Sequence, residues 1–262
     1  MKAMILSAGR GERMRPLTDD TPKALLRVND TPLVVFLIAA LERAGIRELV
    51  INLAHLGDQI AAALGDGTAH GVHIEYSREA EALETAGGIA YALPLLGAAP
   101  FIAVNADVYS DYDFSGLVAA ARTLSAQGPL AHLVLVENPP QHPHGDFGLA
   151  GGHVQAAAAV RHTFSGMGAY HPALFDGIAR GARARLADRL IAAMARRRVT
   201  GELYRGLWQD VGTPEQHLDD LDPLALADLE RLHEVVGRHR EAVRLSDFLE
   251  VRAARGEVAA RR

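Results

Sequence analysis

Two glycines and three arginines lie close together just after the first apolar run of the chain, in the stretch AGRGERMRP at residues 8–16. A glycine-rich turn can direct several backbone N–H groups at one anion, and arginine adds forked donors that fit phosphate oxygens. The stretch therefore indicates a polyphosphate-binding loop, with a surface turn of solvated arginines as the alternative. It lacks the GK[ST] of a Walker A loop and, with methionine at position 14, the third glycine of GxGxxG.

Composition narrows the classes of protein that such a loop could serve. The chain has 262 residues, a formal net charge of −5 and no cysteine. The lack of cysteine excludes disulfides, thiolate catalysis and zinc–thiolate sites. The negative net charge argues against broad nucleic-acid binding. No apolar run approaches the ~18 residues that span a bilayer, and the apolar start is too short for a signal peptide. We therefore expect a cytoplasmic protein with no membrane or nucleic-acid partner.

Apolar runs alternate with helical patterns along the first half of the chain. Strands are predicted at 2–6, 48–54, 73–77, 100–108 and 131–137. Helices are predicted at 33–44, where Gly45 ends the pattern, at 117–126 and at 184–196. A further helix is predicted to start near Thr85 and run through GGIAYALPLL, with Pro94 late enough to bend or end it. This alternation predicts an α/β fold with a mostly parallel sheet and helices on both faces. Ligands bind beyond the carboxyl ends of such strands, where the loop and the polar end of 100–108 would lie.

The glycine-arginine loop continues into a longer and more specific pattern. Residues 8–25, AGRGERMRPLTDDTPKAL, resemble the AGxGxRxxPLTxxxPKxL signature of the sugar-phosphate nucleotidyltransferases. The matched positions are Gly9, Gly11, Arg13, Pro16, Leu17, Thr18, Pro22, Lys23 and Leu25. The resemblance implies a GT-A-like, Rossmann-like fold that joins a nucleoside triphosphate to a sugar 1-phosphate and releases pyrophosphate.

The resemblance also assigns roles within the loop. In that family the loop wraps the triphosphate, so Arg13 is implied at the reacting phosphates and Lys23 is implied to reach them from the far side. Both are candidate catalytic residues. The implied nucleotide contacts from this part of the chain are Ala8, Gly9, Gly11, Glu12, Arg13 and Lys23. Ser7 stands where the family more often has alanine, and it adds a hydroxyl.

Two aspartates in family motifs are the candidate metal ligands. Joining two phosphates brings negative charges together, so the reaction needs Mg²⁺ to bridge and screen them. The stretch VNADV places Asp107 where the family has its first metal aspartate, and WQDVGTPEQ places Asp210 where it has the second. A lone aspartate at a strand end is otherwise a turn or a helix cap. The resemblance implies that both bind Mg²⁺, and Pro214 is predicted to open the next helix.

The stretch EALETAGGIAYAL at 81–93 is the candidate base-binding turn. Glycines at a helix start let the backbone approach a flat base because no Cβ intervenes, whereas the alternative is a simple N-cap by Thr85. The stretch is similar to LETGGGI of the N-acetylmuramate 1-phosphate uridylyltransferases, the MurU family. The nucleotide contacts implied outside the loop are Glu84, Thr85, Gly87, Gly88 and Asn105, the last in reach of ribose or sugar hydroxyls. Ala106 replaces a glycine that is common in relatives.

The sugar side is implied by family position alone. Asp146 in HGDFGL and both Ser165 and Gly166 in TFSGMG would line it together with Asn105, and the alternative is ordinary loop and strand structure. The histidines of HPH at 142–144 have no cysteine or acidic partner spaced as a ligand set, so we expect solvated loop residues.

The resemblance covers about residues 1–221, so we expect a nucleotidyltransferase domain at 1–222. A helical extension of unassigned role is predicted at 223–262, where Leu229, Leu232 and Val236 form an apolar stripe. The implied substrates are UTP and N-acetylmuramate 1-phosphate, in cell-wall recycling. Mannose-1-phosphate guanylyl transfer and glucose-1-phosphate uridylyl or thymidylyl transfer remain open. A non-catalytic nucleotide-sugar sensor is the alternative of another class, and a dinucleotide-dependent oxidoreductase would need the missing GxGxxG.

Overall fold

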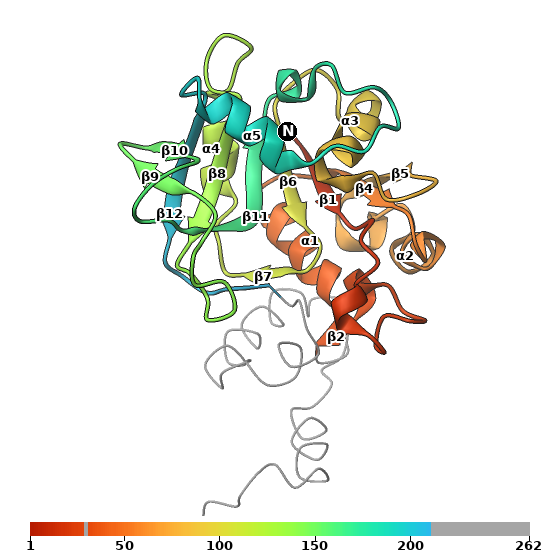
Figure 1. Ribbon diagram of the computed structural model, residues 1–262. Helices are drawn as coiled ribbons and strands as arrows, with labels where there is room; N and C mark the ends of the chain where they lie inside the picture. The colour runs from red at the N-terminus through yellow and green to blue at the C-terminus, as the bar shows by residue number, and fades with distance from the viewer. Residues whose placement is uncertain (29–30, 211–262) are drawn as a thin grey trace, which may run out of the picture.

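The computed structural model describes residues 1–28 and 31–210, and one mixed sheet organises the fold (Figure 1). Its strands are β1 (Lys2–Leu6), β4 (Glu48–Leu53), β5 (His73–Arg78), β6 (Phe101–Asn105), β8 (Ala131–Val136), β9 (Gly148–Ala150), β10 (His153–Gln155), β11 (Thr163–Tyr170) and β12 (Val199–Tyr204). They lie in the order β5-β4-β1-β6-β11-β8-β12-β10-β9. Within this sheet β11 and β10 run against the other strands. The expected largely parallel α/β sheet is confirmed.

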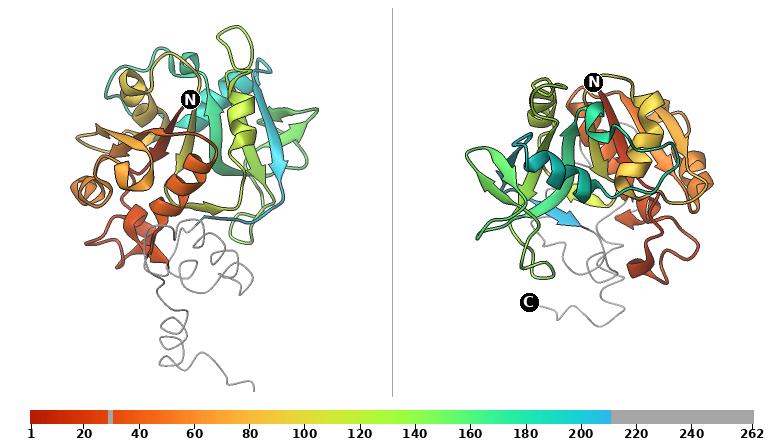
Figure 2. Two further views of the ribbon diagram at one scale, coloured as in Figure 1. Left: turned by 180° about the vertical axis from the view of Figure 1, so that it is seen from behind. Right: turned by 45° about the horizontal axis from the view of Figure 1, so that its top comes forward.

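Helices cover both faces of this sheet (Figures 1 and 2). They are α1 (Leu33–Arg43), α2 (Gly57–Leu64), α3 (Glu84–Leu96), α4 (Ser115–Ala121) and α5 (Leu186–Met194). Successive residues of a strand point to opposite faces. Ala3 and Ile5 of β1 accordingly pack in the core that α1, α2 and α4 cover, whereas Met4 packs in the core under α3 and α5. The apolar runs are continuous because the central strands are buried on both faces.

Short elements connect the longer ones at both edges of the sheet. The 3₁₀ turns are η1 (Glu12–Met14), η2 (Lys23–Leu25), η3 (Thr68–His70) and η4 (Pro172–Phe175). Two two-stranded sheets pair β2 (Arg27–Val28) with β3 (Thr31–Pro32), and β7 (Val108–Ser110) with β13 (Trp208–Asp210). Asp210, one candidate metal aspartate, lies in β13, and Asp107, the other, directly precedes β7.

Some observed strands and helices are shorter than predicted, because turns interrupt the apolar segments. The strand predicted at 100–108 ends at Asn105, and the chain turns at Ala106 before β7 begins. The Ala106 N–H donates to the Leu6 carbonyl at 3.0 Å, which fixes this turn against the end of β1. The helix predicted at 117–126 occupies Ser115–Ala121 instead. Neither α2 nor β12 was predicted.

The start of α3 also differs from the prediction. The helix begins at Glu84, so Thr85 lies inside its first turn and no side chain caps it. The N-cap alternative for Thr85 is therefore wrong. The carbonyl of Ala184 instead accepts the N–H groups of Ala86 and Gly87 at 3.0 and 3.1 Å. Pro94 falls in the last turn, and the helix continues past it to Leu96.

Among the described residues, no helix is both long enough and apolar enough to cross a membrane. The predicted helical extension at 223–262 and the helix start at Pro214 lie outside the described residues, as do the last positions of the predicted domain 1–222.

Candidate active site

The glycine-arginine loop leaves the carboxyl end of β1 and closes through η1. Gly11 has φ +64°, a conformation that favours glycine. The Thr18 hydroxyl donates to the Gly11 carbonyl at 2.8 Å, and a Cβ at Gly11 would lie 2.9 Å from Thr18 Cγ2. Met14 is fully buried and fixes η1 to the core. The loop is therefore held in shape by its own contacts.

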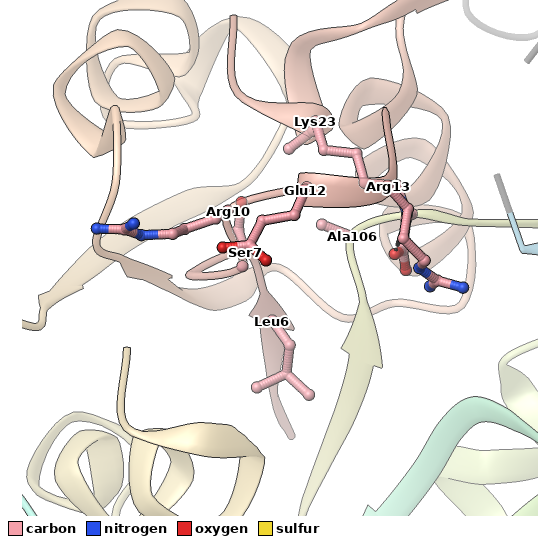
Figure 3. Close-up of a pocket in the computed structure, with 11 residues that line it drawn as sticks. Leu6, Ser7, Arg10, Glu12, Arg13, Lys23 and Ala106 are labelled. Carbon is pink, nitrogen blue, oxygen red and sulfur yellow. Dashed lines mark hydrogen bonds and ion pairs between the residues drawn. The ribbon is translucent and has the colours of Figure 1, made fainter. Parts of the chain in front are cut away.

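A pocket of about 480 Å³ opens beside this loop (Figure 3). It is lined by Leu6, Ser7, Gly9, Arg10, Gly11, Glu12, Arg13, Lys23, Ala24, Ala106 and Asp107. No heavy atom lies within 4 Å of where a Cβ on Gly9 would sit, so the backbone there faces open space. The side chains of Arg10 and Arg13 point to opposite sides of the pocket in Figure 3. Ala8 is buried and does not line the pocket.

Lys23 joins the two candidate metal aspartates. Its Nζ lies 2.5 Å from Asp107 Oδ2 and 3.8 Å from Asp210 Oδ1. Asp107 sits in the turn before β7, and Asp210 of β13 pairs with Val108 in register. Residues far apart in the sequence thus meet beside the pocket, which Lys23 and Asp107 line.

The two carboxylates repel each other across this arrangement. Burial raises the pKa of Asp210, the negative charge of Asp107 raises it further, and Lys23 and Arg13 oppose the rise. Two hard oxygen donors that need a counter-charge fit a divalent cation, which completes its coordination with phosphate oxygens and water. No cluster of three or more His, Cys, Asp or Glu that could hold a metal occurs in the described part of the chain.

At the start of α3, two backbone N–H groups are already hydrogen-bonded within the protein. The N–H groups of Ala86 and Gly87 bond to Ala184, and a Cβ at Gly87 would lie 2.4 Å from the Ala182 carbonyl. Any base contact at this turn therefore falls to Glu84 and Thr85. Glu84 adopts φ +61°, which is uncommon for a residue with a side chain. Its carboxylate lies 3.5 Å from Arg183.

The residues expected at the sugar side have different surroundings. Gly166 has φ +79°, and a Cβ there would lie 2.6 Å from Asn105 Nδ2, so these two residues are brought together. The Ser165 hydroxyl is buried and donates to the Val134 carbonyl at 2.7 Å. One oxygen of Asp146 accepts the Phe164 N–H at 2.8 Å. The other oxygen of Asp146 lies 3.1 Å from the ring of His142, which is partly exposed.

Two polar residues beside the site were not predicted. Asn52 and Glu79 are 4% and 7% exposed, and Asn52 accepts a hydrogen bond from the backbone of Ser7. A signal was present, because Asn52 interrupts the apolar strand ELVINLA with a polar side chain. Its partner could not be inferred, since Asn52 lies on β4 and Glu79 directly follows the neighbouring strand β5.

Comparison with known proteins assigns the family. A family model described as nucleotidyl transferase matches residues 2–223. This chain belongs to the nucleotidyl transferase family. The predicted resemblance is therefore confirmed.

Individual relatives extend the comparison. An N-acetylmuramate alpha-1-phosphate uridylyltransferase from Neisseria meningitidis is 54% identical over 217 residues, which cover 81% of this chain and 94% of that protein. A mannose-1-phosphate guanyltransferase beta-A from Xenopus laevis is 29% identical, covering 83% of this chain and 63% of its own length. Among solved structures, a candidate glucose-1-phosphate thymidylyltransferase from Bacillus anthracis gives a TM-score of 0.72 at 20% identity, covering 93% of this chain and 98% of that one. This structural likeness shows the fold.

Proposed function

We propose that this chain transfers the uridylyl group of UTP to N-acetylmuramate 1-phosphate, giving the nucleotide sugar and pyrophosphate. The observation that carries nucleotidyl transfer is the meeting of Lys23, Asp107 and Asp210 at the end of the glycine-arginine pocket. The substrate pair is supported by the uridylyltransferase that is 54% identical over nearly its whole length.

The proposed reaction is an in-line displacement. An oxygen of the sugar 1-phosphate attacks the α-phosphorus of UTP, the bond to the β-phosphate breaks, and pyrophosphate leaves. The nucleophile is already an anion, so no covalent enzyme intermediate is needed. Backbone N–H groups of Gly9 and Gly11, with Arg13 and Lys23, would hold the phosphates and stabilise their developing charge.

Asp107 and Asp210 are proposed as ligands of Mg²⁺. Mg²⁺ held there would screen the negative charge of the phosphates. The chain contributes two carboxylates on adjacent segments and an ammonium, Lys23 Nζ, which holds them together in the free protein. We infer that Lys23 turns from the carboxylates to the phosphates when substrate binds.

The remaining contacts are proposals from sequence position. We assign Glu12 to the nucleotide with the loop, and Glu84 and Thr85 to its base side. Ala8, Gly87 and Gly88 were also expected at the nucleotide, but the chain itself encloses them, so they are assigned to the shape of these two turns. Asn105, Asp146, Ser165 and Gly166 are assigned to the sugar side. The engaged hydroxyl of Ser165 limits that residue to shaping the backbone at Gly166. A cytoplasmic role in cell-wall recycling follows from the proposed substrates.

The second candidate is guanylyl transfer to mannose 1-phosphate. The guanyltransferase relatives support it at lower identity, and a solved structure of HddC from Yersinia pseudotuberculosis holds GMP-PN in the same fold, with a TM-score of 0.67. A non-catalytic sensor is disfavoured because Arg13, Lys23, Asp107 and Asp210 are all present.

A pyrophosphate-release assay tests the proposal. UTP, GTP, CTP and dTTP are each combined with N-acetylmuramate, glucose and mannose 1-phosphates, with Mg²⁺ present. We expect the highest kcat/KM for UTP with N-acetylmuramate 1-phosphate. A preference for another pair moves the chain to a sister activity, and absence of release with every pair supports the sensor.

A further inference from the structure

A line of buried hydrogen bonds connects the phosphate loop to the start of α3. The Ser7 N–H donates to Asn52 Oδ1 at 2.7 Å, and Asn52 Nδ2 donates to Glu79 Oε1 at 2.7 Å. The other oxygen of Glu79 accepts the N–H of Leu83, the residue before α3, at 3.1 Å. Each bond fits the geometry of a normal hydrogen bond.

The chemistry of this line fixes the orientation of its members. Ser7 offers a backbone donor, so Asn52 must present its carbonyl there and its NH₂ to Glu79. Glu79 then receives an N–H on each of its oxygens, which only an ionised carboxylate can do fully. The three N–H donors of this line therefore each have an acceptor in only one orientation of the Asn52 amide.

Close packing around Asn52 and Glu79 leaves no space for either side chain to adopt another orientation. Asn52 and Glu79 are almost completely buried. Burial raises the pKa of Glu79, while the bonds from Asn52 and Leu83 oppose the rise. A Cβ at Gly88 would lie 2.8 Å from Glu79 Oε1 and 3.0 Å from Asn52 Nδ2, so α3 packs directly on the pair.

We propose that Asn52 and Glu79 are positioning residues that hold the phosphate loop and the start of α3 in fixed relation, so that both sides of the nucleotide site are preorganised together. The two sides belong to different elements, β1 and α3, and the pair bridges them through β4 and the end of β5. The proposal rests on the proposed function, in which the loop meets the triphosphate and α3 meets the base.

Preorganisation of this kind should affect the binding of the nucleotide and not that of the sugar 1-phosphate. A nucleotide that binds to two fixed sides loses less affinity to ordering the protein. Loss of the line should therefore raise KM for UTP while leaving KM for the sugar 1-phosphate unchanged. A general loss of fold would affect both.

Amide hydrogen exchange on the full chain without substrate tests the structural part. In Asn52→Leu we expect faster exchange at the Ser7 amide, and in Glu79→Leu at the Leu83 amide, since a leucine offers no acceptor to either donor. Glu81→Gln removes an exposed carboxylate nearby and is the matched control. Unchanged exchange at both amides overturns the proposal.

Kinetics of a second set of variants with UTP test the functional part. Asn52→Asp places two carboxyl groups against each other, and we expect KM for UTP to rise about tenfold, the size of one lost buried hydrogen bond. Adding Glu79→Gln reverses the middle bond, with the glutamine donating to the aspartate and accepting from Leu83. The double variant should therefore have a lower KM than Asn52→Asp alone.

Failure of this rescue, or equal KM for UTP in wild type and Asn52→Asp, overturns the positioning role. If wild type uses another nucleoside triphosphate, the proposed substrate is wrong, and the same comparison is made with that nucleotide. The exchange result is independent of the substrate.

Discussion

Lys23 is the residue on which the free site depends, because it is the cation that separates two facing carboxylates. Its Nζ contacts Asp107 closely and Asp210 more loosely. Its single positive charge offsets only part of the negative charge of the two carboxylates, and the remainder fits the proposed cation. Lys23 therefore holds Asp107 and Asp210 near each other in the free protein, before substrate binds.

Replacing Asp210 separates catalysis from stability. Asp210→Asn should lower turnover at least about a hundredfold, because a metal ligand is lost. Its raised pKa means that ionisation destabilises the folded, metal-free protein, and this cost appears as the pH rises through the folded pKa. The variant should therefore unfold at equal or higher urea concentration than wild type in EDTA at pH 7. Near-normal rates across a Mg²⁺ titration would show that Asp210 binds no metal.

The two loop glycines should respond differently to a methyl group. Gly9→Ala has open space, so we expect normal thermal unfolding but a KM for UTP that rises about tenfold as the methyl meets the ligand. Gly11→Ala has φ +64° and a contact to Thr18, so it should lose about 1–3 kcal/mol of stability. Normal kcat/KM in Gly9→Ala would place the triphosphate elsewhere.

Ser7 carries a buried hydroxyl that has no hydrogen-bond partner among the described residues. Ser7→Ala removes this group and keeps the backbone bond to Asn52, so the free energy of unfolding should rise by about 1 kcal/mol. Ser165→Ala is the opposite control, because its hydroxyl is bonded to Val134, and it should lower stability. Urea denaturation measures both, and a destabilised Ser7→Ala would contradict the account.

At the scale of elements, apolar periodicity predicted the central strands and α1 because burial alone decides those segments. It could not predict the turn at Ala106, which depends on a bond to Leu6 on another strand. The cap of α3 was mistaken for the same reason, since Ala184 supplies it from a distant segment. Site motifs grouped Asp107 with Asp210 but placed Lys23 at the phosphates, so its contact with the two carboxylates was not predicted. The Asn52–Glu79 pair required knowledge of which strands are neighbours.

The short turn η4 should make stability depend on pH. The unprotonated Nδ1 of His171 accepts the Ala173 N–H at 3.1 Å, and burial lowers the pKa of His171. The unfolded chain therefore takes up the proton first, so stability is full above about pH 6.5 and falls as the pH decreases below it.

His171→Asn keeps a capping acceptor that does not titrate. The loss of unfolding free energy between pH 7.5 and pH 5 should therefore be smaller in this variant than in wild type, as measured by urea denaturation at both values. Equal losses in the two proteins would assign the pH dependence to other groups.

For the whole molecule, the described residues already contain the pocket, Lys23 and both aspartates. A chain truncated after Asp222 should therefore keep its kcat/KM within about threefold, a difference of less than 1 kcal/mol. Steady-state kinetics and light scattering of the truncated chain measure this. Loss of activity in a folded, monodisperse truncated protein would show that 223–262 completes the site.

The pairing of β13 with β7 also orders events during synthesis. Trp208–Asp210 can reach Val108–Ser110 only after β8 to β12 have been made, so this is a contact between distant parts of the chain. Such contacts close late because the intervening chain must first be ordered. A nascent polypeptide that has not yet emerged as far as residue 210 already possesses the glycine loop, Lys23 and one carboxylate. On the proposed function such a polypeptide lacks one of the two metal ligands, so we expect catalytic competence only once β13 has paired with β7.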